Sequence, residues 1–567
     1  MVFGLTYLDL VIILIYVLVI VYMGWYTKRK VASSGDYFMG GRKGSKLMMI
    51  ANAFGAGTHT DQAIAVSGAT YQIGMAGIWY QWIWLLATPF YWIVAPIFRR
   101  VRYVTLGDFF EERYGVKLGV AYTIMGILFF MINLGLILKG TGTAIEAVTK
   151  GALTTEIIVI TLTLFFLGYS VLGGLVSALI VNLIQGLFIL VLSFLLIPFA
   201  LNAAGGISEI KASLPEHMFS FVAPEEVTLF FIVMVIINGL VGIVVQPHHM
   251  AVGGAGKTEV NCRTGWTYGN FTKRFATLGW AFVGVFAAAL FPGLENENRE
   301  LAFGTAVANL LPSGFIGLMV AAMAAAVLAA CHNYMVGGSA LFTRNIYSKI
   351  IKTKLSQDKE LSIARITSVV IVLGGVLIAL TIPSVVQGVK YLWQITAYFG
   401  IGFWAAVMWK RANRQAVWAS LIVTIIITFI TGPYFSFGLG WAIEYQIAAY
   451  LPAGILTFII TALLTKPESN EILDKFYALL HTPAGEEHKL KEKGIEIMLE
   501  GESDDGEKIK SDVPLEERGH SLLVVDLLSL HKKFSFKRYR IDIKGFVWAI
   551  VFVIAIFAIG LITVGIG

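Results

Sequence analysis

Apolar runs of about 20 residues recur along almost the whole chain, and they limit the possible folds more than any other feature. Each run is long enough to cross a bilayer as a helix. Of the 567 residues, 57% are hydrophobic and only 14% are charged, whereas a soluble protein carries roughly 25% charged residues. The sequence therefore predicts an all-α polytopic membrane protein. We expect about 14 transmembrane helices, near residues 7–26, 47–70, 75–98, 118–147, 155–171, 179–201, 228–250, 270–291, 313–343, 362–382, 391–409, 415–432, 446–465 and 545–566.

The basic residues of the loops predict an orientation. "KRK" follows the first apolar run, and alternate loops are basic, including one that we assign to Lys257, Arg263, Lys273 and Arg274. Acidic stretches such as "PGLENENRE" fall in the other loops. Because cytoplasmic loops retain Lys and Arg, we expect both termini outside, as in a bacterial inner membrane. The net charge of +7 is explained by these loops, so membrane lipids are expected as partners and nucleic acid is not.

The chain divides by composition into three parts. Residues 1–465 form a membrane body, residues 466–544 a cytoplasmic segment and residues 545–567 a final transmembrane helix. Within the segment, "ESDDGEKIKSD" is typical of a solvated linker. "SLLVVDLLSLHKKF" (521–534) indicates an amphipathic helix, which would lie on the membrane surface or against the body.

Two predicted spans contain interruptions. "ANAFGAGTHTDQAIAVSG" places Gly55 and Gly57 before a polar group that includes Asp61, and an intramembrane aspartate alone costs roughly 2.5–3.5 kcal/mol. "IINGLVGIVVQPHHMAVGG" contains Pro247, which removes a helix hydrogen bond and frees a carbonyl. The two spans lie five apart. Broken helices at matching positions in two five-helix halves indicate an inverted-repeat secondary transporter, here about residues 47–409, with its site near the midplane.

Further motifs resemble those of one family. They are "RRVRYVTLGDFFEERYG", "GYSVLGGLVSALIVNLIQG", "QPHHM" and "SALFTRNIY". On these stretches, over roughly residues 1–465, the chain resembles a divergent member of the sodium:solute symporter family. The resemblance implies a five-plus-five inverted repeat, alternating access, and sodium-driven uptake of a small organic solute.

The resemblance also implies a sodium site between the first and eighth core helices. Backbone carbonyls at Gly55, Thr58 and Ala326 would supply ligands, and two neighbouring hydroxyls on the eighth helix the rest. Those two hydroxyl positions are Ala329 and Ala330 here. Since a hard cation requires oxygen ligands, we expect sodium binding to be weakened. Apart from a possible sodium ion, we expect no cofactor.

Titratable and amide residues stand where the family carries acids or hydroxyls. His332 occupies a position that is often acidic in the family, and Asn182 that of a usual aspartate. Because histidine titrates near neutral pH, His332 and His59 are candidates for a proton pathway. Residual sodium coupling, uncoupled use, and a neutral buried His332 bound to a freed carbonyl remain alternatives.

The candidate solute contacts are polar side chains of the broken helices and an aromatic neighbour. Amides and a carboxylate can bind hydroxyl groups as donors and acceptors, whereas tryptophan can stack on a cationic or apolar solute. The sugar/polyol, amino acid and carboxylate classes remain open. The family resemblance implies Asp61, Gln62 and Asn238 as contacts, and the other candidates are Trp84, Gln246 and Gln394, with Thr396 as a weaker one. We expect Lys139 to extend to the membrane interface, and pairing with a carboxylate is its alternative role.

The sequence favours a secondary transporter of a small organic solute. The alternatives are an uncoupled facilitator or channel, and a sensor or scaffold that acts through residues 466–544. An enzyme is not expected, since no metal cluster or nucleophile arrangement is evident, and adjacent His248 and His249 make a poor metal pair.

Overall fold

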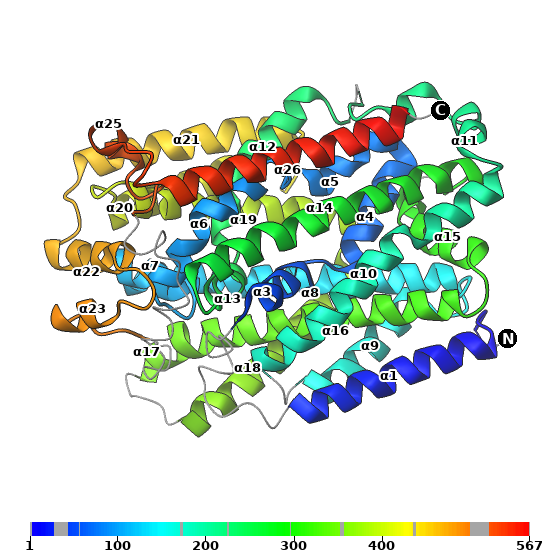
Figure 1. Ribbon diagram of the computed structural model, residues 1–567, viewed down its shortest axis with the longest axis horizontal. Coiled ribbons are helices and arrows are strands. Elements are labelled where there is room, and N and C mark those ends of the chain that lie inside the picture. Colours follow the sequence, from blue (N-terminus) through cyan, green and yellow to red (C-terminus); the bar gives the residue numbers. More distant parts are fainter. Residues whose placement is uncertain are drawn as a thin grey trace.

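The computed structural model describes residues 3–27, 44–55, 57–170, 174–223, 226–294, 296–351, 357–434, 438–498 and 521–565 (Figure 1). Within these ranges there are helices and two isolated bridges, Gly44 with Gly256 and Ala223 with Val227, but no β-strand. The longer helices are α1 (Tyr7–Thr27), α3 (Lys46–Gly55), α4 (Thr60–Ile73), α6 (Thr88–Arg100), α7 (Leu106–Tyr114), α8 (Val116–Val148), α9 (Thr155–Ser170), α10 (Gly174–Ala204), α12 (Leu229–Gly242), α14 (Glu259–Leu290), α15 (Ala302–Leu310), α16 (Phe315–Phe342), α18 (Gln357–Thr381), α19 (Val385–Met408), α20 (Arg414–Thr431), α21 (Ile443–Leu464), α22 (Asn470–His481) and α26 (Arg540–Gly565). The shorter elements are η3 (Gly74–Ile78), α5 (Trp79–Trp82), α11 (Ile207–Ser213), η4 (Glu216–Phe219), η5 (Ile243–Val245), α13 (His249–Gly254), η6 (Asn296–Leu301), η7 (Thr343–Tyr347), α17 (Ser348–Ile351), α23 (His488–Glu492), η10 (Leu527–Ser529) and α25 (Leu530–Lys533).

The all-α prediction is confirmed, whereas the prediction of about 14 spans is not. In the described part of the chain, seven helices are long and apolar enough to cross a membrane, or up to eight if one bent pair counts as one span. The expected number was about 14. The difference arises partly because several expected spans are interrupted: the span near 75–98 is divided into η3, α5 and α6, with Gly74 at φ +68° ending α4.

Helix α14 is the central packing element of the body. It packs against α3, α4, α6 and α10. A Cβ at Gly269 would lie 2.6 Å from the Ile50 carbonyl oxygen of α3, and one at Gly284 would lie 2.2 Å from the Ser67 carbonyl oxygen of α4. Small residues of this kind let membrane helices approach closely. The position of α14 relative to both α3 and α4 is therefore fixed by backbone contact.

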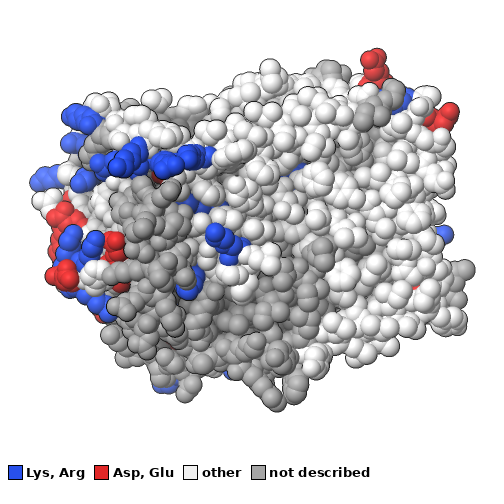
Figure 2. Space-filling model, in the orientation of Figure 1, with Lys and Arg blue, Asp and Glu red and all other residues white. Residues whose placement is uncertain are grey.

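The two ends of the molecule differ in charge. Figure 1 shows both termini at the right end, and α22, α23 and α25 at the left. On the face in Figure 2, most Lys and Arg side chains gather over the left end. The charge asymmetry expected from the loops is therefore visible in three dimensions.

Residues 466–498 pack against this basic end. The Arg100 guanidinium makes two hydrogen bonds with the Glu259 carboxylate, at 2.9 and 3.0 Å, and a third with the Leu480 carbonyl. Arg102 pairs with Glu487 at 3.1 Å. Burial acts to raise the pKa of the Glu487 carboxyl, but the positive charges of Arg102 and Arg99 outweigh it and lower that pKa. The segment is thus held by the Arg102–Glu487 ion pair and by the bond from Arg100 to the Leu480 carbonyl.

The predicted amphipathic helix over residues 521–534 was too long. Only η10 and the one-turn α25 are helical, and residues 523–526 form turns. Tertiary bonds stabilise this conformation, because the Asp542 carboxylate accepts from the Leu523 N–H and the Asp526 carboxylate from the Tyr539 hydroxyl. Leu522 is buried, so this stretch packs against the protein.

We predict that Arg100→Ala destabilises the purified protein by about 3–5 kcal/mol, because it leaves the Glu259 carboxylate buried without its partner. Lys489→Ala is the control, since Lys489 belongs to an exposed pair with Glu486 and should cost under about 1 kcal/mol. Thermal unfolding followed by tryptophan fluorescence would measure both. Equal effects of the two substitutions would show that the Arg100 contact does not hold the segment.

Candidate functional site

The first interruption lies between α3 and α4, as predicted. Helix α3 ends at Gly55, and α4 begins at Thr60 after His59, whose backbone is extended (φ −135°, ψ 167°). Breaking the helix here leaves backbone groups without their helical partners. The Gly57 carbonyl accepts hydrogen bonds from the Gln62 side-chain amide, at 3.0 Å, and from the Lys273 ammonium.

The second interruption lies between α12 and α13 and is also confirmed. After η5, the chain is extended at Gln246 (ψ 124°), and α13 then begins at His249. The freed carbonyls are again satisfied by side chains. The Tyr122 hydroxyl donates to the Val245 carbonyl at 2.7 Å, and His249 Nδ1 contacts the Ile243 carbonyl. At both interruptions, therefore, side chains bond to backbone carbonyls that the break frees.

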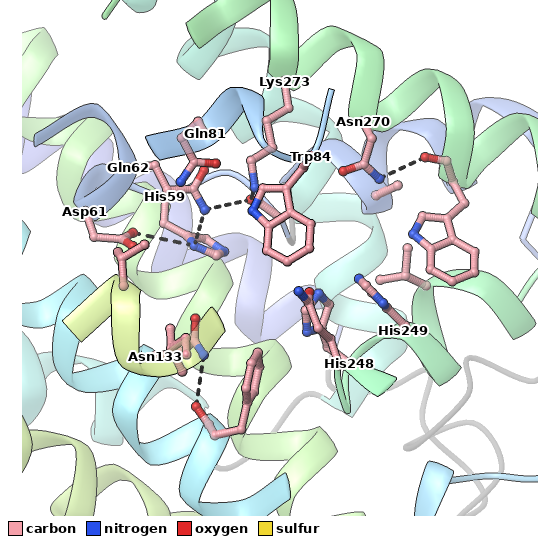
Figure 3. A pocket seen from close by; sticks show the side chains of 18 of the residues that line it. His59, Asp61, Gln62, Gln81, Trp84, Asn133, His248, His249, Asn270 and Lys273 are labelled. Carbon is pink, nitrogen blue, oxygen red and sulfur yellow. Dashed lines mark hydrogen bonds and ion pairs between the residues drawn. The ribbon is translucent and has the colours of Figure 1, made fainter. Parts of the chain in front are cut away.

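A cavity of about 90 Å³ opens beside both interruptions (Figure 3). Its walls come from α4, η3–α6, α8, α13, α14, α16 and α19. Polar and charged side chains make up half of the lining: His59, Asp61, Gln62, Gln81, Asn133, Gln246, His248, His249, Asn270, Lys273 and Arg274. The remaining side chains are mostly aromatic: Trp84, Tyr91, Phe129, Trp266, Tyr334 and Trp393, with Ala53, Gly57, Val252, Val389 and Leu392.

Two adjacent cations of α14 enter this cavity. Lys273 and Arg274 are both buried, so their assignment to a cytoplasmic loop is wrong. Arg274 lies 3.3 Å from the Gln81 carbonyl oxygen and 3.5 Å from the Asn270 side-chain oxygen. Within the described lining, Asp61 is the only acid, and its carboxylate lies 3.6 Å from His59 Nδ1. The cavity therefore carries an excess of cationic groups.

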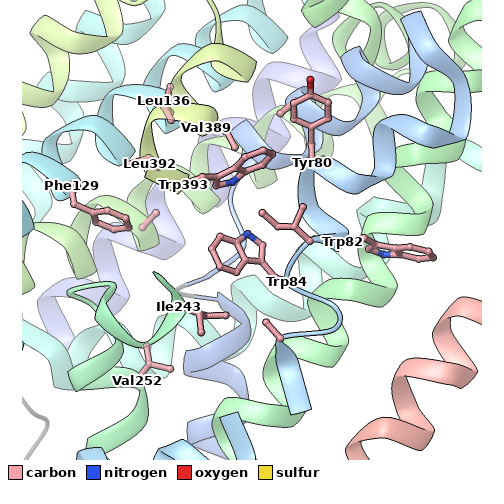
Figure 4. Packing of buried hydrophobic residues seen from close by; sticks show 14 of the residues in the cluster. Tyr80, Trp82, Trp84, Phe129, Leu136, Ile243, Val252, Val389, Leu392 and Trp393 are labelled. Atoms are coloured by element: carbon pink, nitrogen blue, oxygen red, sulfur yellow. The ribbon is translucent and has the colours of Figure 1, made fainter. Parts of the chain in front are cut away.

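Aromatic rings form another part of the wall (Figure 4). Trp84 and Trp393 face the same space, and Tyr80 lies beside Trp393 with ring centroids 5.9 Å apart. Trp84 also packs on α12, since a Cβ at Gly239 would lie 3.3 Å from its ring. Trp82 instead points away from the cavity and stacks on Phe221. The tryptophan-rich stretch thus contributes one ring, Trp84, to the cavity wall.

The structure separates the sequence-based solute candidates into two groups. Asp61, Gln62, Trp84 and Gln246 line the cavity, as does His59. Asn238 and Gln394 lie elsewhere. Asn238 donates to the Trp393 carbonyl and accepts from the Tyr450 hydroxyl, while Gln394 bonds to Gln446 and Tyr434. The weaker candidate Thr396 and Lys139 both donate to backbone carbonyls, Lys139 to that of Ile382.

The sodium-site positions implied by the family resemblance lie on α3, α16 and the link that follows α3. Ala326 lines a separate cavity of about 40 Å³ together with His59 and Thr60. The Thr60 hydroxyl donates to the Met323 carbonyl of α16 at 3.3 Å. Gly55 is the last residue of α3, Thr58 is buried in the link, and Ala330 is buried on α16. The side chain of Ala329 lies outside the described part of the chain.

The proton-pathway candidates differ in their surroundings. His59 reaches the main cavity and packs edge-on against Tyr334 of α16, with ring centroids 5.6 Å apart. His332 is buried on α16 but is not among the described residues that line either cavity. Asn182 lies in α10, and its side chain is outside the described part. Tyr334, two residues beyond His332, is thus the α16 residue that faces His59.

Sequence reasoning missed Lys273, Arg274, Asn270 and Tyr334. A signal for the first three was present. Thr258 caps α14 by accepting from the Asn261 N–H, a pattern that predicts a helix start. Starting the helix at 259 rather than 270 places "TKRF" inside the membrane body. His248 and His249 line the cavity together, but no group of three or more His, Cys, Asp or Glu that could hold a metal occurs among the described residues.

Two interrupted helices beside a buried polar cavity define the architecture of a solute transporter. A sequence model of the Sodium:solute symporter family matches residues 37–424. The chain belongs to this family, and it is a membrane transporter rather than an enzyme.

Relatives and solved structures agree with this assignment. The Sodium/glucose cotransporter of Vibrio parahaemolyticus is 25% identical over 468 residues, covering 74% of this chain and 84% of that protein. The osmoregulated proline transporter OpuE of Bacillus subtilis is 24% identical over 485 residues, covering 80% and 94%. A Na+-coupled sialic acid symporter in a substrate-bound outward-open state has a TM-score of 0.69 at 17% identity, covering 82% of this chain and 99% of that one. This structural likeness shows a shared fold.

Cysteine labelling can test the cavity wall. In a Cys262→Ala, Cys331→Ala background, both native thiols being buried, we predict that Gln246→Cys reacts with a small methanethiosulfonate reagent. Asn238→Cys, eight residues earlier and packed between α19 and α21, should react at least about tenfold more slowly. Mass spectrometry of intact protein would follow both reactions. Faster labelling at position 238 would contradict the placement of the cavity.

Proposed function

We propose that this protein is a secondary active transporter that moves a small polar organic solute by alternating access through the cavity between α3–α4 and α12–α13. The observation that carries the proposal is the convergence of both interrupted helices on one polar cavity. Unwound backbone at membrane depth is tolerated where it lines such a space. In transporters with inverted repeats, such helices form the solute site, and we infer a five-plus-five repeat here.

The side chains of the cavity indicate a solute that is small and rich in hydrogen-bonding groups. A volume of about 90 Å³ holds roughly six to nine water-sized groups. Gln62 and Gln246 offer amides, Asp61 a carboxylate and Trp84 a ring face. The sugar and proline transport named for the relatives is consistent with this class. Sugars or polyols, amino acids and small carboxylates all meet the requirement.

We infer that the basic end, with residues 466–498 packed on it, faces the cytoplasm, and that both termini face outward. The support is the clustering of Lys and Arg at the end opposite the termini, which follows the positive-inside rule. Under this orientation residues 466–544 form a cytoplasmic segment and α26 is the final transmembrane helix. We place the protein in a plasma membrane of the bacterial inner-membrane type.

Facilitated diffusion is the second candidate function. Ala329 and Ala330 replace the hydroxyls of the implied sodium site, and the Thr60 hydroxyl nearby is bonded to Met323. A position that lacks these two side-chain oxygens binds sodium more weakly. Coupling through protons, with His59 inside the cavity, would keep transport active, whereas the absence of any coupling would make the protein a facilitator.

The decisive measurement is uptake into proteoliposomes of a solute that thermally stabilises the purified protein, chosen from sugars, amino acids and small carboxylates. We expect accumulation above equilibrium when an ion gradient is imposed. A sodium gradient, a proton gradient and no gradient are compared, so the active carrier and the facilitator give different results. Equilibration alone in all three would establish facilitated diffusion.

We expect Gln62→Ala to weaken the apparent affinity for that solute by roughly 3–10-fold, the effect of one lost hydrogen bond. Gln72→Ala is the matched control, because Gln72 is an exposed glutamine on the same helix and should leave the affinity unchanged. Uptake that is insensitive to Gln62→Ala and to Trp84→Ala would place the solute pathway elsewhere.

A further inference from the structure

We propose that Lys273 is a built-in monovalent cation at the α3–α4 break, and that its ammonium occupies a position that would otherwise take a free cation such as sodium. This inference rests on the proposed function, because it concerns how the transporter supplies positive charge to its central cavity. The observation behind this proposal is that the Lys273 ammonium of α14 bonds directly to the Gly57 carbonyl, which the break between α3 and α4 frees.

The position of the ammonium is set by rigid elements. Lys273 is only 7% exposed, and its Nζ donates to the Gly57 carbonyl. Figure 3 shows its side chain extending toward the break beside Gln62. The close approach of α14 to α3 fixes the distance it must span, since a Cβ at Gly265 would meet Met49 at 2.3 Å. A Cβ at Gly57 would itself lie 2.8 Å from the Ala53 carbonyl oxygen.

The break offers more oxygen atoms than donors. Thr58 Oγ1, Asp61 Oδ1 and Gln62 Oε1 are all buried, and none has a hydrogen-bond donor among the described residues. Together with the Gly57 carbonyl, these four oxygens occur within six consecutive residues. Oxygen ligands of this kind suit a hard monovalent or divalent cation. The local chemistry of the link therefore favours a positive charge, which Lys273 provides.

Burial and the neighbouring Arg274 oppose a positive charge on Lys273, and the Asp61 carboxylate favours it. The direct bond to the Gly57 carbonyl is the contact that stabilises an ammonium here. A buried charge without compensation is strongly unfavourable, and here the carbonyl of Gly57 and the charge of Asp61 provide the compensation. Because Lys273 is covalently attached, its nitrogen cannot leave the cavity during a transport cycle as a free ion would.

This arrangement explains how the fold can tolerate alanines at the implied sodium position. In a sodium-coupled carrier, the ion adds positive charge beside the first core helix only when it binds. Here α14 adds that charge permanently, on the cavity side of the same break. The consequence is that closure around the solute does not require sodium at the break.

The test is thermal unfolding of the purified full-length protein in sodium chloride against choline chloride at equal ionic strength. The wild type and Lys273→Arg, which both retain the charge, should show no sodium-specific shift. Lys273→Met removes the charge and leaves the oxygens, so sodium at several times its Kd should raise the unfolding temperature by about 2–4 °C, saturably. The shift should disappear in the double variant with Asp61→Asn.

Two results would overturn the proposal. One is a saturable sodium-specific shift in the wild type that Asp61→Asn abolishes, because the break would then bind sodium beside Lys273. The other is a folded Lys273→Met protein that ignores sodium. If Lys273→Met does not fold, Lys273→Ala is purified in methylammonium chloride, which should stabilise it relative to choline chloride, and the absence of that rescue also counts against the proposal.

These outcomes are independent of the test of the proposed function. Uptake that depends on Gln62 and Trp84 supports the solute pathway whether or not Lys273 acts as the cation. A sodium-responsive wild type with the same uptake would overturn only the role of Lys273. Uptake that ignores the cavity variants would overturn the pathway while leaving the sodium measurements interpretable.

Discussion

The structure depends on the need to satisfy backbone polar groups where two helices are interrupted inside an apolar body. A continuous helix satisfies its own backbone, but each break frees carbonyl and N–H groups that lipid cannot bind. The Tyr122 hydroxyl, His249 and the Gln62 amide each supply a partner for one of these carbonyls. The polar cavity follows from this requirement, because the side chains that satisfy the breaks must gather beside them.

Helix α14 connects this cavity to the basic end of the molecule. At its first residue, Glu259 binds Arg100 and the Ala484 N–H of the segment packed there. Fourteen residues later, about 21 Å along a helix, Lys273 reaches the Gly57 carbonyl. One rigid element thus links the Glu259 contacts at residues 466–498 with the break between α3 and α4. A movement of α14 relative to α3 would have to disturb both.

Charge in the cavity is balanced differently from what the family resemblance implies. The resemblance implies sodium between α3 and α16, but alanines occupy the two hydroxyl positions of that site, Ala329 and Ala330. The cationic groups come instead from α14, opposite the single acid Asp61. A cationic side chain that belongs to the chain cannot diffuse away as a free ion does, so under our proposal the energetics of closure rest on the solute.

The sequence alone determined the membrane class and the two interruptions, and it pointed to Asp61, Gln62 and Gln246, which line the cavity, because composition, glycine and proline act over a few neighbouring residues. Tertiary structure decided which side chains face the cavity. Asn238 was expected there, but the rotation of α12 points it toward Trp393 and Tyr450, and a sequence does not specify that rotation. Lys273 and Arg274 resembled loop cations, because positive charge near a span end is ordinarily solvated. Only the packing of α14 against α3 and α4 shows that both side chains are buried and that Lys273 lies at the break.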